Sequence, residues 1–312
     1  MGKTQIHITS LRFQYPQATL PLFEDIDLTF AVGWTAVLGA NGAGKSTLLQ
    51  LASGILRPER GTVIGPDHTR YVAQRTDDPP PNFETFAYAY DRDACRLHGI
   101  LEIERDWIYR WDTLSHGERK RAQIACALYE EPYALAIDEP TNHLDEDAIR
   151  MVGDALESFK GIGILVSHDR ALSDRLCTNT VIVHAPYVRV LNCKPSVALE
   201  ESSRISKASY RTLQTERQKA SRLSSELKRR SQVADVQDRK KSKRNIAVKD
   251  HDAKARIDGA RISGADGKAG RLKAQIETRE GHLNASLQKM QGNLVEANML
   301  DLGKPVSGIT IE

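Results

Sequence analysis

The chain has 312 residues, of which 40% are hydrophobic and 27% are charged, and its formal net charge is +3. This length corresponds to about two domains, and the composition excludes a chain that is disordered throughout. No run of about 18 apolar residues occurs and the start lacks the apolar stretch of a secretory signal, so we expect a cytoplasmic protein without a membrane-spanning helix.

Charge and aromatic residues divide the chain near residue 200. Residues 1–200 contain 20 Lys and Arg against 27 Asp and Glu, together with 17 of the 18 aromatic residues. Residues 201–300 contain 23 Lys and Arg against 12 Asp and Glu, and Tyr210 is their only aromatic residue. We therefore predict a globular domain over residues 1–198, a basic helical segment over 199–300 and a short tail over 301–312.

Alternating or continuous apolar runs predict eight strands in the globular domain. These are residues 6–13, 26–30, 34–38, 62–64, 70–73, 135–138, 163–167 and 180–184. Helical patterns begin at Lys45, Ser115, Glu146 and Arg170. Strands that alternate with helices predict an α/β fold with a mostly parallel sheet covered on both faces, and ligands of such sheets bind beyond the carboxyl ends of the strands.

A phosphate-binding loop is the most specific pattern in the chain. It fits G-x-x-x-x-G-K-[ST] and consists of Gly39, Ala40, Asn41, Gly42, Ala43, Gly44, Lys45 and Ser46. Glycines allow backbone N–H groups to converge on phosphate oxygens, and the N-terminus of the following helix adds partial positive charge. We expect Lys45 to contact the outer phosphates and the Ser46 hydroxyl to bind Mg²⁺.

Polar residues also follow three other predicted strands. Asp138 and Glu139 end an apolar strand, where the first would hold Mg²⁺ through water and the second would act as general base. Gln74 could contact Mg²⁺ or the attacking water, and His168 could bond a γ-phosphate. Taken singly, Gln74 is more simply interpreted as a loop amide and His168 as an ordinary surface or core histidine. Ser115 is the second residue of the segment Leu-Ser-His-Gly-Glu at 114–118 and is expected to cap a helix, which is also its simplest role.

The order of these motifs resembles an ATP-binding cassette (ABC) domain over about residues 4–195. The run Asp-Glu-Pro-Thr-Asn-His-Leu-Asp at 138–145 resembles the ABC-F subfamily, whose members lack membrane spans and mostly act on ribosomes. Residues 249–258 resemble the linker that joins the two cassettes of ABC-F proteins. ABC domains of transporters usually have a different sequence after the Asp-Glu pair.

This resemblance implies roles for individual residues. Tyr15 would stack on adenine, while Lys45, Ser46 and Thr47 would hold the phosphates and Mg²⁺. Glu139 would be the catalytic base and His168 the γ-phosphate switch. Ser115, Gly117 and Glu118 would contact the γ-phosphate of ATP on another cassette. Asp145 would couple the two sites across the interface. His116 replaces a glycine that is usual in the family, and we expect its side chain to crowd or reshape that contact.

The basic segment contains two series of apolar residues at helical spacing. They are Leu213, Ala220, Leu223, Leu227 and Ala234, and then Leu272, Ile276, Leu283, Leu287, Met290 and Leu294. They predict an antiparallel helical hairpin of coiled-coil type. Residues 239–245 between them include five basic residues. A solvated charge run is one interpretation, and contact with RNA phosphates is the other; the resemblance favours ribosomal RNA or tRNA.

One phosphate loop occurs, whereas ABC sites form between two cassettes and ABC-F proteins usually carry both in one chain. The resemblance thus implies a fragment lacking its C-terminal cassette, with residues 301–312 as the approach to it, or a homodimer, or a pair with another protein. Three functions follow from it: an ABC-F ATPase acting on the ribosome in translation or ribosome protection, the ATPase subunit of an ABC transporter, and a nucleotide-binding fragment with little activity.

Overall fold

The computed structural model describes residues 5–240, 278–279, 281–282 and 285. The chain divides into two units, and the described residues through Ser203 form the first of them. All of the candidate site residues belong to this first unit.

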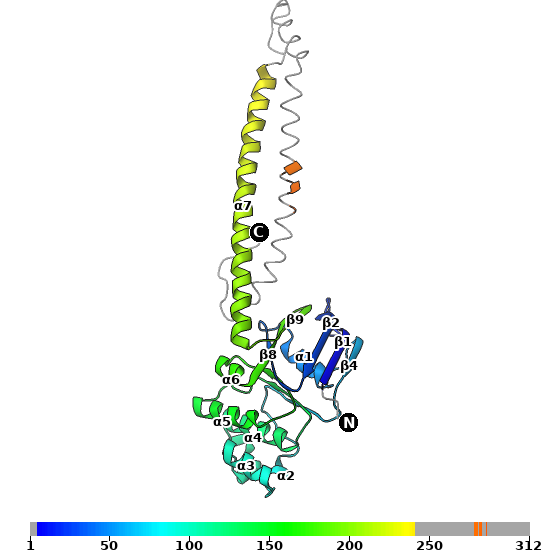
Figure 1. The fold of residues 1–312 in the computed structure, drawn as a ribbon, viewed down its shortest axis with the longest axis vertical. Helices are drawn as coiled ribbons and strands as arrows, with labels where there is room; N and C mark the ends of the chain where they lie inside the picture. Colours follow the sequence, from blue (N-terminus) through cyan, green and yellow to red (C-terminus); the bar gives the residue numbers. More distant parts are fainter. Residues whose placement is uncertain (1–4, 241–277, 280, 283–284, 286–312) are drawn as a thin grey trace, which may run out of the picture. The chain divides into compact units, whose positions relative to one another are not determined.

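A six-stranded sheet forms the centre of the first unit (Figure 1). Its order is β5 (Thr69–Val72), β6 (Ala134–Asp138), β7 (Ile162–Val166), β3 (Gly33–Leu38), β8 (Cys177–His184) and β9 (Tyr187–Leu191). All neighbours are parallel except β8 and β9. Every residue of β6 and β7 is buried, as continuous apolar runs in central parallel strands predict.

The expectation of one mostly parallel sheet is wrong for three strands. β1 (Gln5–Phe13), β2 (Phe23–Ala31) and β4 (Arg60–Ile64) form a separate antiparallel sheet in the order β2-β1-β4. Buried and exposed residues alternate along most of β2, which is typical of an antiparallel sheet with one solvated face. A hydrophobic cluster joins residues of this sheet, such as Phe30, to residues of the central sheet, such as Ile164.

The four predicted helices are confirmed as α1 (Lys45–Ala52), α4 (His116–Tyr129), α5 (Glu146–Glu157) and α6 (Arg170–Leu176). The stretch between β5 and α4 holds elements that the sequence did not predict: α2 (Phe83–Ala87), α3 (Arg92–Leu101) and the short 3-10 helices η1 (Arg105–Tyr109) and η2 (Trp111–Thr113). Figure 1 shows α2 and α3 at the end of this unit away from the antiparallel sheet. α3 packs against α4 and α5.

A 46-residue helix, α7 (Pro195–Lys240), begins at the end of the first unit and continues into the second. It covers the first helix of the predicted hairpin and begins four residues before the predicted boundary at residue 199. Proline suits the first position of a helix, where its missing N–H is not needed. Most of the predicted second helix, most of the basic run 239–245 and all of the tail 301–312 lie outside the described residues, and the hairpin stays a prediction. In the part of the chain that the structure describes, no helix is long and apolar enough to cross a membrane.

Candidate active site

The phosphate-binding loop connects β3 to α1. Gly42 and Gly44 have φ angles of +80° and +99°, in the left-handed region that favours glycine. A Cβ atom on Gly39 would lie 2.6 Å from the carbonyl oxygen of Val183, so this position is closely packed. The N–H of Ala43 donates to the carbonyl of Ala40 across the turn, at 3.1 Å. The loop therefore has the tight form that the sequence predicts.

A cavity of about 730 Å³ lies beside this loop. Its volume is within the range of small-molecule sites. Its lining includes eleven of the predicted site residues: Tyr15, Asn41, Gly42, Gly44, Lys45, Ser46, Thr47, Gln74, Asp138, Glu139 and His168. Leu22 and Asn142 also line it and were not predicted. Five separate parts of the chain thus meet at this cavity: the stretch with Tyr15 and Leu22, residues 41–47, Gln74, residues 138–142 and His168.

Lys45 is one of the residues that line the cavity. Its Nζ donates to the carbonyl oxygens of Gly39 and Ala40 at 2.9 and 3.2 Å. Burial lowers the pKa of the Lys45 ammonium, whereas the negative charges of Glu139 and Asp138 raise it. The ammonium is held against the loop, on the side where an anion would bind.

Asp138 is a buried carboxylate with a hydrogen-bond donor of its own. The phenolic O–H of Tyr71 on β5 donates to Oδ2 of Asp138 at 3.2 Å. Burial, followed by the charge of Asp138, raises the pKa of Tyr71 to about 12, so the phenol stays protonated. Tyr71 is not predictable from the sequence, because a tyrosine on an apolar strand resembles any core residue.

Glu139 and His168 form a pair at the ends of β6 and β7. Nε2 of His168 lies 3.1 Å from Oε1 of Glu139, and the backbone N–H of His168 donates to Oε2 at 3.1 Å. Burial raises the pKa of the Glu139 carboxyl, and the neighbouring His168 opposes this rise. Glu139 also has a φ of +50°, and such strain in a non-glycine residue is typical of functional sites.

Tyr15 also lines the cavity, and 42% of its surface is exposed. Its hydroxyl is 2.9 Å from the hydroxyl of Thr47, and its ring packs edge-on against Phe13 at 4.9 Å. The phenol is therefore fixed from two sides, which leaves an exposed aromatic surface beside the phosphate loop.

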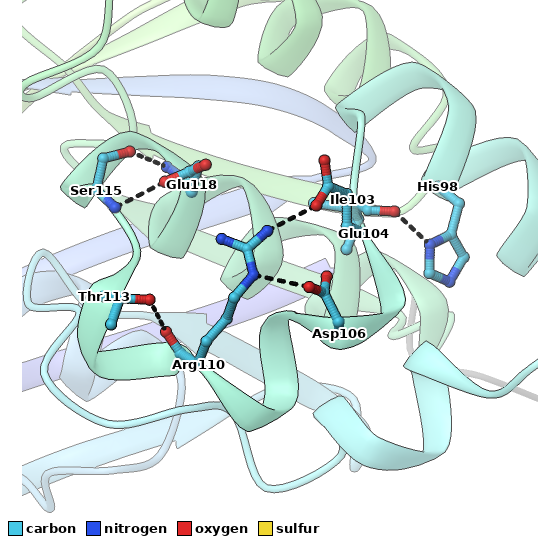
Figure 2. A network of polar contacts seen from close by, with 8 residues as sticks. All are labelled: His98, Ile103, Glu104, Asp106, Arg110, Thr113, Ser115 and Glu118. Carbon is cyan, nitrogen blue, oxygen red and sulfur yellow. Dashed lines mark hydrogen bonds and ion pairs between the residues drawn. The ribbon is translucent and has the colours of Figure 1, made fainter.

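The segment at Ser115 lies outside this cavity and forms a capping box at the start of α4 (Figure 2). Oγ of Ser115 accepts from the N–H of Glu118 at 3.2 Å, and the Glu118 carboxylate accepts from the N–H of Ser115 at 2.7 Å. Asp145 likewise caps α5, with Oδ1 accepting from the N–H of Ala148 at 2.8 Å. Neither these residues nor Gly117 line the cavity beside Lys45.

His116 turns toward other loops of its own chain. Its Nδ1 lies 2.5 Å from the hydroxyl of the buried Thr76, and its ring stacks on His143 with centroids 5.2 Å apart and planes at 5°. A second cavity, of about 490 Å³, lies here and shares Gln74 and Asn142 with the first. The histidine that departs from the family pattern therefore joins the start of α4 to two neighbouring loops.

The oxygen donors of the first cavity suit Mg²⁺ rather than a softer metal. A hydroxyl from Ser46, a carboxylate from Asp138 and an amide from Gln74 are hard ligands, and magnesium is usually held by one or two carboxylates together with phosphates. Among the residues that the structure describes, no group of three or more His, Cys, Asp and Glu side chains is placed to hold a metal ion.

Residues 23–142 match the family model described as ABC transporter. A putative ABC transporter ATP-binding protein of Nitratidesulfovibrio vulgaris is 31% identical over 242 residues, which cover 65% of this chain and 88% of that protein. The chain belongs to the ABC transporter family. Its first unit is an ATP-binding ABC cassette.

Two other relatives are longer proteins. The probable ATP-binding protein YbiT of Escherichia coli O157:H7 is 38% identical over 174 residues, covering 51% of this chain and 32% of YbiT. The ribosome protection protein VmlR of Bacillus subtilis is 31% identical over 177 residues, covering 56% of this chain and 30% of VmlR. The chain thus matches about a third of the length of these two relatives.

A solved structure of a dimeric bacterial ABC transporter cassette has the same fold. It superposes with a TM-score of 0.51 at 19% identity, covering 60% of this chain and 98% of that cassette. The similarity agrees with the fold described above.

Proposed function

We propose that this ABC cassette binds ATP with Mg²⁺ in the cavity beside Lys45 and hydrolyses it. One observation carries the proposal: the phosphate loop, the Asp138–Glu139 pair and His168 line the same cavity. Catalysis of phosphoryl transfer depends on positioning and charge stabilisation, and a lysine, a carboxylate that holds Mg²⁺ and a second carboxylate that acts as base can supply both.

Residues of the loop bind the phosphates in this proposal. Lys45 exchanges its contacts with Gly39 and Ala40 for the outer phosphates, and the backbone N–H groups of the loop hold the inner ones. The exposed aromatic ring of Tyr15 stacks on adenine. Ser46 and Asp138 would hold Mg²⁺, with Thr47 and Gln74 beside them, and the ion when bound would neutralise charge on the phosphate oxygens.

Glu139 acts as the general base. Its raised pKa makes it a stronger acceptor for the proton of an attacking water than an exposed glutamate would be. His168 holds this carboxylate through its ring and its backbone N–H, and the ring presents a donor to the γ-phosphate. The base is thereby oriented before substrate binds.

A second cassette would complete the site. Ser115, Gly117, Glu118 and Asp145 lie outside the cavity of their own chain, which agrees with a role toward nucleotide held by another cassette. The partner would be a second copy of this chain or another ABC protein. A dimeric arrangement is the one named for the similar bacterial cassette.

The substitution Glu139→Gln tests the hydrolytic part of the proposal. It keeps the size and polarity of the side chain but removes the proton acceptor, so turnover should fall by a factor of about 10² to 10⁴ while ATP binding persists. The exposed Glu157, which pairs with Arg175 away from the cavity, offers the control Glu157→Gln. Unchanged turnover in Glu139→Gln would assign the base to another residue.

For the biological target we propose the ribosome, within the ABC-F subfamily. Three observations support this target: the sequence at 138–145, the long helix α7 after the cassette and the similarity to a ribosome protection protein. The basic helical linker would contact ribosomal RNA or tRNA through phosphates. Association should therefore weaken steeply as salt rises.

The ATPase subunit of an ABC transporter is the second candidate, favoured by the name of the Nitratidesulfovibrio vulgaris relative. Sedimentation with purified ribosomes separates the two. ATP-dependent pelleting that increases in Glu139→Gln would support the ribosome, because ATP would persist in that variant. Pelleting that is absent, or equal with and without ATP, would contradict a nucleotide-controlled role on the ribosome.

A further inference from the structure

The loop of residues 73–77, which carries Gln74, is bound along its length by side chains from residues 111–123. Nζ of Lys120 donates to the carbonyl oxygens of Ala73 and Gln74 at 2.6 and 3.0 Å. The remaining contacts are the Gln123 amide to the carbonyl of Arg75 at 2.9 Å, His116 to the Thr76 hydroxyl at 2.5 Å, and the Trp111 indole N–H to the carbonyl of Asp77 at 3.0 Å.

Lys120 is the most unusual member of this set because it is a buried cation, with 2% of its surface exposed. Its third acceptor is Oε1 of Gln123 at 3.2 Å, so all three ammonium protons have neutral partners. Burial lowers the pKa of Lys120 to about 8, against a smaller opposing effect of Asp138. Burying a charge is costly unless it is well hydrogen-bonded, and here the bonds are made to a loop.

The sheet does not fix the loop of residues 73–77 through backbone pairing, as it fixes the strand before the loop. β5 ends at Val72, whose partner in the ladder is Ile137 of β6, and the sheet pairing goes no further. From Ala73 onward, the carbonyl oxygens of the loop accept hydrogen bonds from side chains of α4 and of the turn before it. The loop is therefore attached to α4 rather than to the sheet edge.

We propose that Lys120 is a positioning residue for Gln74, which it holds at a fixed place relative to the start of α4. The inference rests on the proposed function, in which Gln74 contacts Mg²⁺ or the attacking water and Ser115 faces the nucleotide of a second cassette. Because one helix carries both the Ser115 segment and Lys120, a shift of α4 on pairing with another cassette would carry Gln74 with it. His116 contributes a further contact of the same kind, which a glycine could not make.

Tryptic cleavage after Arg75 measures the attachment directly, without nucleotide. Arg75 is exposed, but its peptide bond can enter a protease only when the loop detaches. Lys120→Met keeps the length of the side chain and removes the donors, so cleavage should accelerate about tenfold, the factor for one charge-assisted hydrogen bond. Gln123→Ala, at a half-buried position, should accelerate it roughly threefold. Lys160→Met removes an exposed lysine that donates to the carbonyl oxygen of Glu157, and the rate of cleavage after Arg75 should stay unchanged.

Steady-state kinetics separate positioning from general stability. In Lys120→Met and Gln123→Ala, kcat should fall while KM and the Kd for ATP stay within about twofold, because the phosphate loop is untouched. Gln123→Ala keeps the test decisive if Lys120→Met does not fold. Unchanged cleavage after Arg75 in folded Lys120→Met, or equal loss of kcat and ATP affinity, would overturn the inference. Failure of the unmodified chain to bind ATP would instead overturn the proposed function, while the cleavage result would still stand.

Discussion

Single residues of the site depend on neighbours that lie far away in the sequence. Asp138 receives its hydrogen bond from Tyr71, 67 positions earlier, and Lys120 bonds carbonyl groups that lie 46 and 47 positions before it. The phosphate loop and the Asp138–Glu139 pair were predictable because each is a local pattern whose spacing reflects its chemistry. Tyr71, Asn142 and Lys120 were not, because their roles arise only when separate segments meet.

Tyr71→Phe should weaken Mg²⁺ binding. The variant removes one hydroxyl, so Asp138 loses the donor that orients its carboxylate, and loss of such an outer contact typically costs 10- to 100-fold in metal affinity. The Mg²⁺ concentration for half-maximal ATP turnover should rise about tenfold, whereas ATP binding without Mg²⁺ should not change. Tyr133→Phe, an exposed tyrosine packed on His68, is the matched control. An unaltered Mg²⁺ requirement would show that the phenol does not serve the metal site.

The elements show where periodicity predicts structure and where it does not. β6 and β7 are continuous apolar runs and were predicted to within one residue at each end. α2 has five residues and follows three consecutive prolines, so it lacks the two turns that reveal a helical period. The separate antiparallel sheet was missed for a different reason: strand patterns do not by themselves tell which strands pair.

The contact between His116 and Thr76 should stabilise the start of α4 against the Gln74 loop. Thr76 is 1% exposed, so His116→Gly leaves a buried hydroxyl without its partner, which costs about 1 kcal/mol. His116 is the first residue of α4, where glycine adds little to that cost, so the free energy of unfolding in urea should fall by about 1 kcal/mol. Thr76→Val in the same background completes a double-mutant cycle, and we expect a coupling energy of about 1 kcal/mol. A coupling near zero would mean that the two side chains do not interact in solution.

At the scale of the whole molecule, the division of predicted site residues into two sets is the main feature. One set lines the cavity beside Lys45, and the other, from Ser115 to Glu118 together with Asp145, caps helices outside it. This division is the reason for proposing that two cassettes share each site. The sequence resemblance predicted the division, and the separate positions of the two sets agree with it.

Two copies of the chain should pair around ATP when hydrolysis is blocked. For Glu139→Gln with ATP and Mg²⁺, light scattering should show the mass rising from that of one chain, 34.7 kDa, to about twice that value. ADP should leave the mass at one chain, since the γ-phosphate contact would be missing. A constant mass with ATP would contradict the homodimer and direct the search to a different ABC protein as partner.

Equilibrium binding of a fluorescent ATP analogue tests the central claim most directly. The unmodified chain should bind it, and Lys45→Ala should raise the Kd about a hundredfold, since the lysine makes charge-assisted contacts to the outer phosphates. Lys160→Ala, away from the cavity, should bind as the unmodified chain does. An affinity in Lys45→Ala equal to that of the unmodified chain would contradict the assignment of this cavity as the ATP site.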